Sequence, residues 1–408
     1  MKKRILILSV FIALYTHAQD DAHAQDDILA IVLMVKNEEA VIVKTLQPYL
    51  DAGINSFLVF DTGSEDATIA NAENFFKANH VKHWFIVQEP WIDFCTSRNH
   101  ALEAAEDCFP DTPFYLMPDA EWYMHNVKGL LDFCEERLYD TSPCYLVRIM
   151  NSSIDFTATR LIRAKSNARF LDDVHEAIPI PNNQALSVKV PGDVFFELSA
   201  SRQGVEKSRK RWERDLVLLL KRHQADPAAP RPTFYLAQTY DCLGDAYNAY
   251  KYYKIRSEQE GWHEENYETF YRLGLLTEKL SETDSAYTWS MAFDYYSIAH
   301  NMLPHRAEPL VRIADHYWPD CSAPLNVALC YLFAKRACEL PYPEHDLLFI
   351  DPYTYNLKRY ELLSKSAWHV GDFESGEMAT RNALKVQEMP YLLNNLAVYI
   401  GRRMQSQG

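Results

Sequence analysis

Residues 28–39, ILAIVLMVKNEE, decide the fold of the first half of this chain. The apolar run over residues 28–35 is short and rich in β-branched side chains, so it predicts a buried strand. Lys36, Asn37, Glu38 and Glu39 follow directly, and acidic side chains favour the first turn of a helix. A buried strand that runs into a helix is the start of a βα unit.

The same alternation continues to about residue 150. Short apolar runs alternate with amphipathic segments, and further strands are predicted at 56–60, 83–87, 114–117 and 144–149. Such a pattern predicts parallel strands joined by helices that cover both faces of the sheet. We therefore expect an α/β domain with a mostly parallel sheet over residues 28–203, with ligand-binding residues at the carboxyl ends of its strands.

The second half, residues 204–408, has a helical hydrophobic period throughout. A segment that begins at Phe234 recurs loosely from Phe270, 36 residues later, and a further copy runs from Ala367 to Ala383. This offset is close to the period of about 34 residues that is typical of tetratricopeptide repeats. We expect an α-helical repeat domain, and the alternative is an irregular helical domain whose aromatic residues are simply core.

Composition limits the classes of function. The chain has 408 residues, with 41 Lys and Arg against 56 Asp and Glu, a formal net charge of −15. A length of this order suggests two domains. The acidic balance repels polyanions, so we expect no nucleic acid partner.

The N-terminus predicts export. Lys2, Lys3 and Arg4 precede an apolar run over residues 5–15, which predicts a signal peptide at 1–18, followed by a linker at 19–27. The run is about half as long as the roughly 20 residues that a membrane-spanning helix needs. We expect an exported or secretory-pathway protein, and the alternative is membrane association through an uncleaved N-terminus.

The eight cysteines do not predict a metal site. They show no CxxC pair and no zinc-type spacing, so a structural zinc ion is not expected. Most lie in apolar or helical contexts, where buried free thiols are usual. One or two disulfides remain open in an exported chain.

Three polar segments lie where the predicted sheet would bind a ligand. Glu38 follows the first strand, and Asp61 ends the second at a turn that contains Gly63. A carboxylate in that place can accept hydrogen bonds from a base or a ribose. Arg98 and Asn99 lie at a helix start, where a guanidinium and an amide are placed to meet phosphate oxygens.

A fourth segment suggests a metal site. Asp119 and Glu121 lie two residues apart, directly after the apolar strand predicted at 114–117. In an extended chain their side chains point the same way, so they can share one divalent ion that bridges a diphosphate. A surface turn also carries acidic residues, although it rarely follows so apolar a strand.

Taken in order, these segments resemble the motifs of a family 2 glycosyltransferase of the GT-A fold, in the branch that carries tetratricopeptide repeats behind the catalytic domain. The matching segments are VKNEE (35–39), DTGSEDAT (61–68), RNHAL (98–102), DAEW (119–122), TRLIR (159–163) and VHE (174–176). The match covers residues 28–180, and the repeats extend it over most of the chain. Its specificity comes from the order and spacing of the motifs.

The resemblance implies an activity: metal-dependent transfer of a sugar from a nucleoside-diphosphate sugar, UDP-linked, to an acceptor hydroxyl with inversion. Asp61 would hold the uracil or the ribose and Arg98 the diphosphate, with Glu38 also at the donor site. Asp119 and Glu121 match the D-x-D pair that holds Mn²⁺ or Mg²⁺, although the family has Asp where this chain has Glu121. A Glu reaches about one methylene further and still ligates such an ion.

The late motif implies the remaining site residues. His175 would complete the metal shell or pair with a phosphate, and Glu176 is the first candidate for the catalytic base, with Asp173 the second. The acceptor is open among glycan, lipid and protein, and a protein partner is expected at the helical repeats. The alternative is a catalytically inactive, glycosyltransferase-like protein that binds or scaffolds through those repeats.

Overall fold

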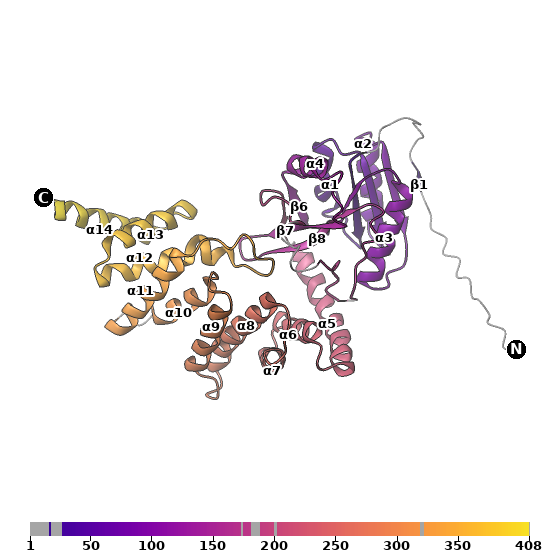
Figure 1. Ribbon diagram of the computed structural model, residues 1–408. Helices are drawn as coiled ribbons and strands as arrows, with labels where there is room; N and C mark the ends of the chain where they lie inside the picture. Colours follow the sequence, from indigo (N-terminus) through magenta and orange to yellow (C-terminus); the bar gives the residue numbers. More distant parts are fainter. Residues whose placement is uncertain are drawn as a thin grey trace. The chain divides into compact units, whose positions relative to one another are not determined.

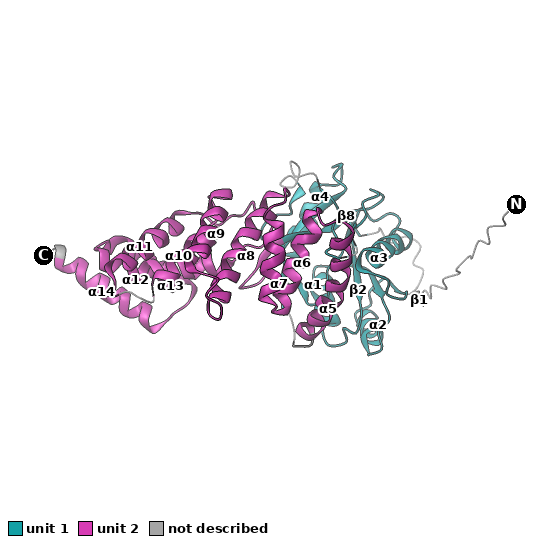
Figure 2. Cartoon of the chain, turned by 90° about the horizontal axis from the view of Figure 1, so that it is seen from below, with its two compact units in different colours: residues 1–149, 157–201 teal, residues 150–156, 202–408 magenta. Residues whose placement is uncertain are grey.

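The computed structural model describes residues 16–17, 27–172, 174–180, 188–199, 202–318 and 322–407. The chain divides into two compact units, coloured separately in Figure 2: residues 1–149 with 157–201, and residues 150–156 with 202–408. Asp173 and Cys321 lie outside the described residues. So do the predicted signal peptide and linker, apart from residues 16–17 and Asp27.

One mixed sheet forms the first unit (Figure 1). Its described strands are β1 (Thr16–His17), β2 (Leu29–Val35), β3 (Ser56–Asp61), β4 (His83–Gln88), β5 (Phe114–Leu116), β6 (Trp122–His125), β7 (Cys144–Met150), β8 (Asp155–Arg163) and β9 (Phe195–Leu198), in the order β1-β4-β3-β2-β5-β8-β7-β9-β6. Strands β4, β3, β2 and β5 are parallel, whereas β8 is antiparallel to β5, β6 to β9 and β1 to β4. The mostly parallel sheet is confirmed, and the antiparallel strands were not expected.

Helices cover both faces of the sheet, as expected. The helices of this unit are α1 (Ile42–Asp51), α2 (Thr68–Ala78), α3 (Phe94–Cys108) and α4 (Val127–Glu136). Leu58 of β3 shares a buried core with Leu102 of α3, whereas the ring of Phe57 lies 5.3 Å from that of Phe76 in α2. Because successive side chains of a strand point to opposite faces, α2 and α3 lie on opposite sides of the sheet.

The register of the parallel strands brings the predicted site segments to one edge. Val35 of β2 lies opposite Asp61 of β3, so these strands end in step. Strand β5 ends at Leu116, opposite Ile31 of β2, and the chain after it leads to Asp119. The edge where parallel strands end is where ligands collect in such sheets.

The second unit is an α-helical repeat region. Its described α-helices are α5 (Arg202–Ala225), α6 (Pro230–Leu243), α7 (Ala246–Arg256), α8 (His263–Ser281), α9 (Trp289–Met302), α10 (Glu308–Tyr317), α11 (Pro324–Glu339), α12 (Arg359–Val370), α13 (Phe373–Val386) and α14 (Pro390–Gln407). A short π-helix, η2 (Thr354–Lys358), leads directly into α12. Consecutive helices pack against each other along the chain (Figure 1). Among the described residues, no helix is long and apolar enough to cross a membrane.

Two of the predicted repeat copies contain the same type of turn between their helices. Gly244 and Gly371 end α6 and α12 with φ of +86° and +79°, a conformation that favours glycine. The next residues, Asp245 and Asp372, cap α7 and α13 by accepting a hydrogen bond from a backbone N–H three residues on. The Gly-Asp pair thus ends one helix and begins the next in both copies.

The cysteines form no disulfide within the described part of the chain. The described free thiols are Cys95, Cys108, Cys134, Cys144, Cys242, Cys330 and Cys338. Cys134, Cys144 and Cys330 are buried, as expected, whereas Cys95, Cys108 and Cys338 are half-buried and Cys242 is exposed.

Candidate functional site

Four charged side chains form a network at the edge of the sheet where the parallel strands end. Arg98 Nε donates a hydrogen bond to Glu176 Oε1 at 2.7 Å, and Arg98 Nη2 donates to Asp119 Oδ1. Arg160 Nη2 lies 3.7 Å from Asp119 Oδ2 and 4.0 Å from Glu176 Oε1. We call these four residues the arginine–carboxylate cluster.

Burial differs among the members of the cluster. Arg98 and Arg160 are 2% and 6% exposed, and the side chain of Glu176 is 9% exposed. The side chain of Asp119 is 32% exposed. Buried charges need partners, and here two cations face two anions. Asp119 is therefore the member of the cluster that faces solvent.

The two arginines differ in how well their charge is compensated. Burial lowers the pKa of Arg98, but the neighbouring Asp119 and Glu176 outweigh that effect and raise it overall. Burial and the charge of Arg98 lower the pKa of Arg160, and the two carboxylates offset this only in part. Arg160 is thus the less compensated cation.

Both guanidinium groups also keep a spare donor. Arg98 Nη1 and Arg160 Nε are buried and have no hydrogen-bond acceptor. A buried donor without an acceptor costs about 1–3 kcal/mol, so this cluster is short of acceptor oxygens. A phosphate would supply them, because its oxygens match the donors of a guanidinium.

Helix α3 places Arg98, and the neighbouring Asn99 holds the opposite loop. Asp93 caps α3 by accepting a hydrogen bond from the N–H of Thr96 at 2.7 Å. Asn99 Oδ1 accepts a hydrogen bond from Phe170 N at 2.8 Å, and Asn99 Nδ2 donates to Phe170 O at 3.0 Å. The expectation that this amide meets phosphate is therefore wrong in this structure, because the amide binds the chain's own backbone.

The loop that Asn99 holds carries the late motif. Leu171 and Ala177 exchange two backbone hydrogen bonds, 2.9 and 3.1 Å long, which close the loop over the intervening residues. Glu176 points from this loop to Arg98, and His175 has a left-handed backbone with φ of +55°. Asp173, the second candidate base, lies outside the described residues.

Two aromatic rings lie against the arginines. The guanidinium carbon of Arg160 is 5.1 Å from the ring centroid of Trp122 and 6.0 Å from that of Phe170, and Arg98 is 5.7 Å from the Phe170 ring. Such contacts orient planar guanidinium groups. Trp122 thus packs against Arg160.

Arg160 is the site residue to which sequence reasoning assigned no role. It lies on β8, a strand that was not expected, and its carbonyl accepts a hydrogen bond from Met117 N at 2.8 Å. This pairing brings Arg160 beside the chain that leads to Asp119. The signal in the sequence was a cation inside a run whose neighbours, Leu161 and Ile162, are apolar.

The predicted metal pair has a different backbone from the one expected. Trp122 N donates to Asp119 O at 3.2 Å, so residues 119–122 form a turn, and Glu121 has a left-handed φ of +67°. The expectation that strand alternation aligns the two carboxylates is therefore wrong. Among the described residues no three His, Cys, Asp or Glu side chains form a metal-binding group, so Asp119, Glu121 and His175 do not form one here.

Asp61 organises the turn that follows it. It is fully buried, and its carboxylate accepts hydrogen bonds from Gly63 N at 3.2 Å and Ser64 N at 3.1 Å. Ser64 Oγ in turn accepts a hydrogen bond from Asn37 N at 2.8 Å, and Glu38 N donates to Thr68 Oγ1 at 2.6 Å. The segments 35–39 and 61–68 are therefore held together by hydrogen bonds. The donor-binding roles of Asp61 and Glu38 stay predictions.

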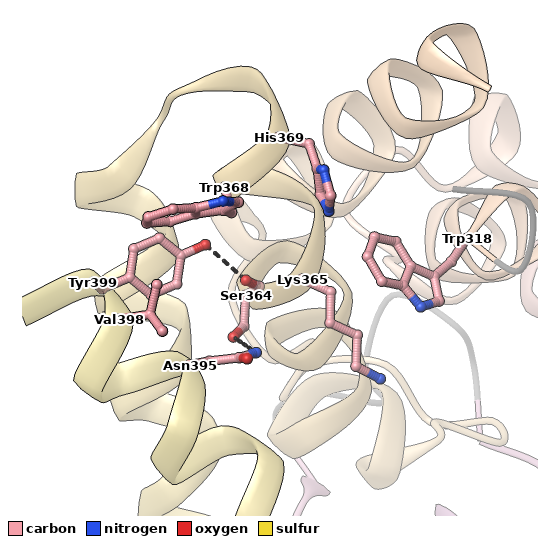
Figure 3. A pocket seen from close by; sticks show the side chains of 8 residues that line it. All are labelled: Trp318, Ser364, Lys365, Trp368, His369, Asn395, Val398 and Tyr399. Atoms are coloured by element: carbon pink, nitrogen blue, oxygen red, sulfur yellow. Dashed lines mark hydrogen bonds between the residues drawn. The ribbon is translucent and has the colours of Figure 1, made fainter. Parts of the chain in front are cut away.

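A separate hollow of about 240 Å³ lies in the helical unit. Figure 3 shows its lining residues, Trp318, Ser364, Lys365, Trp368, His369, Asn395, Val398 and Tyr399. Tyr399 Oη donates to Ser364 O at 2.7 Å, and Asn395 Nδ2 donates to Ser364 Oγ at 3.1 Å. None of these lining residues is acidic, so the hollow has no carboxylate for acid–base or metal chemistry.

Comparison with known proteins gives distant structural likenesses. No family model matches the chain, and no curated protein matches it. The mannosyltransferase PcManGT from Pyrobaculum calidifontis, in complex with GDP-Man and Mn²⁺, is 14% identical with a TM-score of 0.37 and covers 69% of this chain and 88% of its own. MamA is 13% identical with a TM-score of 0.34, over 46% of this chain and 95% of its own.

A tetratricopeptide repeat protein gives a similar result. The C-terminal part of a repeat-containing protein from Cytophaga hutchinsonii is 13% identical with a TM-score of 0.34, over 47% of this chain and 66% of its own. These likenesses are too distant to assign a role, so the function of this chain rests on its own residues.

Proposed function

We propose that this chain is a metal-dependent glycosyltransferase that moves a sugar from a nucleoside-diphosphate sugar, UDP-linked, to an acceptor hydroxyl with inversion. The observation that carries the proposal is the arginine–carboxylate cluster, in which buried Arg98 and Arg160 face Asp119 at the carboxyl edge of a parallel sheet. Two spare guanidinium donors at such an edge suit a diphosphate. The six motifs quoted above supply the resemblance to family 2.

The carboxylates fit a divalent ion only in part. Asp119 and Glu121 offer the oxygen ligands that Mg²⁺ and Mn²⁺ prefer, and Asp119 is partly open to solvent. The described residues offer no third protein ligand nearby, so phosphate oxygens and water would fill the remaining coordination positions of the ion. A bound ion would neutralise charge that develops on the leaving diphosphate.

The residues of the chain bind and orient the donor in this proposal. Arg98 and Arg160 hold phosphate oxygens, while Phe170 and Trp122 keep the guanidinium planes in place. For single displacement with inversion, a carboxylate must take the proton from the acceptor hydroxyl. Glu176 is our first candidate and Asp173 the second, although Glu176 must then leave its hydrogen bond with Arg98.

One variant separates the two roles open to Glu176. If Glu176 is the base, Glu176→Gln lowers kcat by about 100-fold or more while nucleotide affinity changes little. If Glu176 instead only positions Arg98, the same variant weakens nucleotide binding and lowers kcat by a similar factor. The measurements are sugar transfer or donor hydrolysis and calorimetric nucleotide titration on one preparation.

A specific observation favours a second candidate, an inactive protein that binds or scaffolds through its helical repeats. Asp119 is already neutralised by two arginines, and Glu121 departs from the resembled motif. In this case the helical unit contacts a protein partner, and the first unit turns over no donor. The same alternative fits export by a cleaved leader, whereas an enzyme needs a secretory lumen or an uncleaved N-terminus that reaches a nucleotide-sugar pool.

Calorimetric titration of the chain tests the proposal. Uridine diphosphate and guanosine diphosphate are each titrated with and without Mn²⁺, on the wild type, Asp119→Asn and Asp132→Asn. Asp132 is an exposed residue of α4 and serves as the matched control. Nucleotide binding that Mn²⁺ tightens in the wild type and in Asp132→Asn, but not in Asp119→Asn, supports the transferase. Absence of binding by either nucleotide to folded wild type favours the scaffold.

A further inference from the structure

Asp119 lies between the two arginines of the cluster and contacts each with a different carboxylate oxygen. One carboxylate oxygen bonds Arg98 Nη2, and the other lies 3.7 Å from Arg160 Nη2. This is the bridging arrangement that two phosphate oxygens would adopt between two guanidinium groups. Asp119 therefore occupies the position that suits an anionic ligand.

We propose that Asp119 is a placeholder anion, which the diphosphate of the donor displaces from Arg98 and Arg160 and so releases to the divalent ion. This inference rests on the proposed function and adds two points to it. Asp119 leaves the two arginines when the donor binds, and the metal ion and the nucleotide bind interdependently.

Burial indicates which carboxylate exchanges. The side chain of Glu176 is 9% exposed and bonds Arg98 Nε, whereas that of Asp119 is 32% exposed. A ligand that enters from solvent reaches Asp119 first. Glu176 and the ring of Phe170 stay against Arg98, and Trp122 stays against Arg160, so both guanidinium groups keep their places when Asp119 leaves.

Charge balance supports the coupling. Arg98 and Arg160 carry two positive charges, and Asp119 and Glu176 carry two negative charges, so the cluster is neutral as it stands. A divalent cation alone meets two guanidinium groups beside its ligand, and a diphosphate alone meets two carboxylates. Together their opposite charges cancel, so each ligand removes the repulsion that opposes the other.

Spare donors provide the second, independent observation. Arg98 and Arg160 are both more than nine-tenths buried, so water does not reach their inner donors. Arg98 Nη1 and Arg160 Nε are nevertheless without an acceptor. Asp119 alone supplies too few oxygens for both groups. A diphosphate carries more acceptor oxygens and can satisfy donors that the carboxylate leaves without a partner.

The test is calorimetric titration of the full chain with Mn²⁺ alone, with uridine or guanosine diphosphate alone, and with each in the presence of the other. For the wild type we expect each ligand to tighten the other by the same factor, about tenfold or more. Arg160→Gln should weaken nucleotide binding by about tenfold and tighten Mn²⁺ alone several-fold, because one cation beside Asp119 is gone. Arg169→Gln is the control, since Arg169 pairs with Glu106 outside the cluster.

A second variant keeps the proposal testable if Arg160→Gln fails to fold. Asp119→Asn removes the placeholder charge, so nucleotide alone should bind this variant several-fold more tightly than the wild type, while Mn²⁺ no longer improves binding. Equal weakening of Mn²⁺ and nucleotide by Arg160→Gln would overturn the inference, as would independent binding of the two ligands to the wild type. Absence of any nucleotide binding to folded wild type would instead overturn the proposed function itself.

Discussion

The side chain of Asn99 makes two hydrogen bonds with the backbone of Phe170. Asn99 Oδ1 accepts from Phe170 N at 2.8 Å, and Asn99 Nδ2 donates to Phe170 O at 3.0 Å. The two residues are 71 positions apart in the chain. Phe170 in turn lies against the guanidinium groups of Arg98 and Arg160. Asn99 is thus a positioning residue, which acts on the arginine–carboxylate cluster through the loop it holds.

Asn99→Ala should therefore loosen that loop. The N–H of Phe170 would lose its acceptor, and a polar group left without a partner costs about 1–3 kcal/mol of unfolding free energy. Nucleotide affinity should fall as well, because Glu176 follows in the same loop. Urea denaturation and calorimetry measure the two effects. Asn79→Ala is the control, because Asn79 makes its hydrogen bond at the exposed end of α2, and equal losses in both variants would contradict the prediction.

Glu121 combines a strained backbone with a predicted metal-binding role. Its φ of +67° is unfavourable for a residue with a side chain, so Glu121→Gly should raise the unfolding free energy by about 1 kcal/mol. Glu121→Ala keeps the strain and loses the carboxylate equally. Both variants should lose Mn²⁺ affinity in the presence of a nucleoside diphosphate, and only the glycine variant should gain stability. Unchanged Mn²⁺ affinity in both would remove Glu121 from the metal site.

Much of the fold could be predicted from local pattern. The strands that begin at Ser56, His83 and Cys144 start where the apolar runs predicted them, because a strand buried on both faces is a continuous apolar run. The repeated Gly-Asp turn was also visible in the sequence. Strands β6, β8 and β9 were missed, since their pairing joins segments far apart in the chain.

Only the site residues that lie in recognisable sequence motifs could be assigned a role from the sequence. Arg98, Asp119 and Glu176 were singled out separately, and the structure brings them together. Arg160 had no assigned role because only the register of β8 against β5 places it there. The turn at Glu121 was missed for a related reason: strand alternation was extended past Leu116, where β5 already ends.

Tight helix packing in the repeat region gives a prediction about stability. A Cβ on Gly274 of α8 would lie 2.4 Å from the ring of Tyr296 in α9, which is fully buried. Gly274→Ala should therefore lower the unfolding free energy by about 1–3 kcal/mol. A Cβ on Gly401 of α14 meets nothing within 4 Å, so Gly401→Ala should be neutral or stabilising by up to about 1 kcal/mol. Chemical denaturation measures both, and a Gly274→Ala variant as stable as Gly401→Ala would show that the helices can separate freely.

Glu264 should make the stability of the helical unit depend on pH. Burial, and next the charge of Asp346, raise its pKa to about 7, even though its carboxylate accepts hydrogen bonds from Leu347 N at 2.8 Å and Leu348 N at 2.7 Å and Arg306 lies nearby. Between pH 4.5 and about 7, Glu264 therefore holds its proton to a greater extent in the folded chain than in the unfolded chain. The contribution of protonated Glu264 to the unfolding free energy is fully present below pH 4.5 and is lost as the pH rises through about 7.

Glu264→Gln removes this titration and keeps an acceptor oxygen for the two backbone N–H groups. At pH 8 the variant should unfold at a higher temperature than the wild type, by an amount that corresponds to at most about 3 kcal/mol. At pH 4.5 the two proteins should be nearly equal, because Glu264 is then protonated and uncharged. Thermal melts from pH 4.5 to 8 measure the difference, and Glu282→Gln, at an exposed position, should leave the profile unchanged. A Glu264→Gln difference that stays constant with pH would mean that Glu264 is ionised in the folded chain throughout this range.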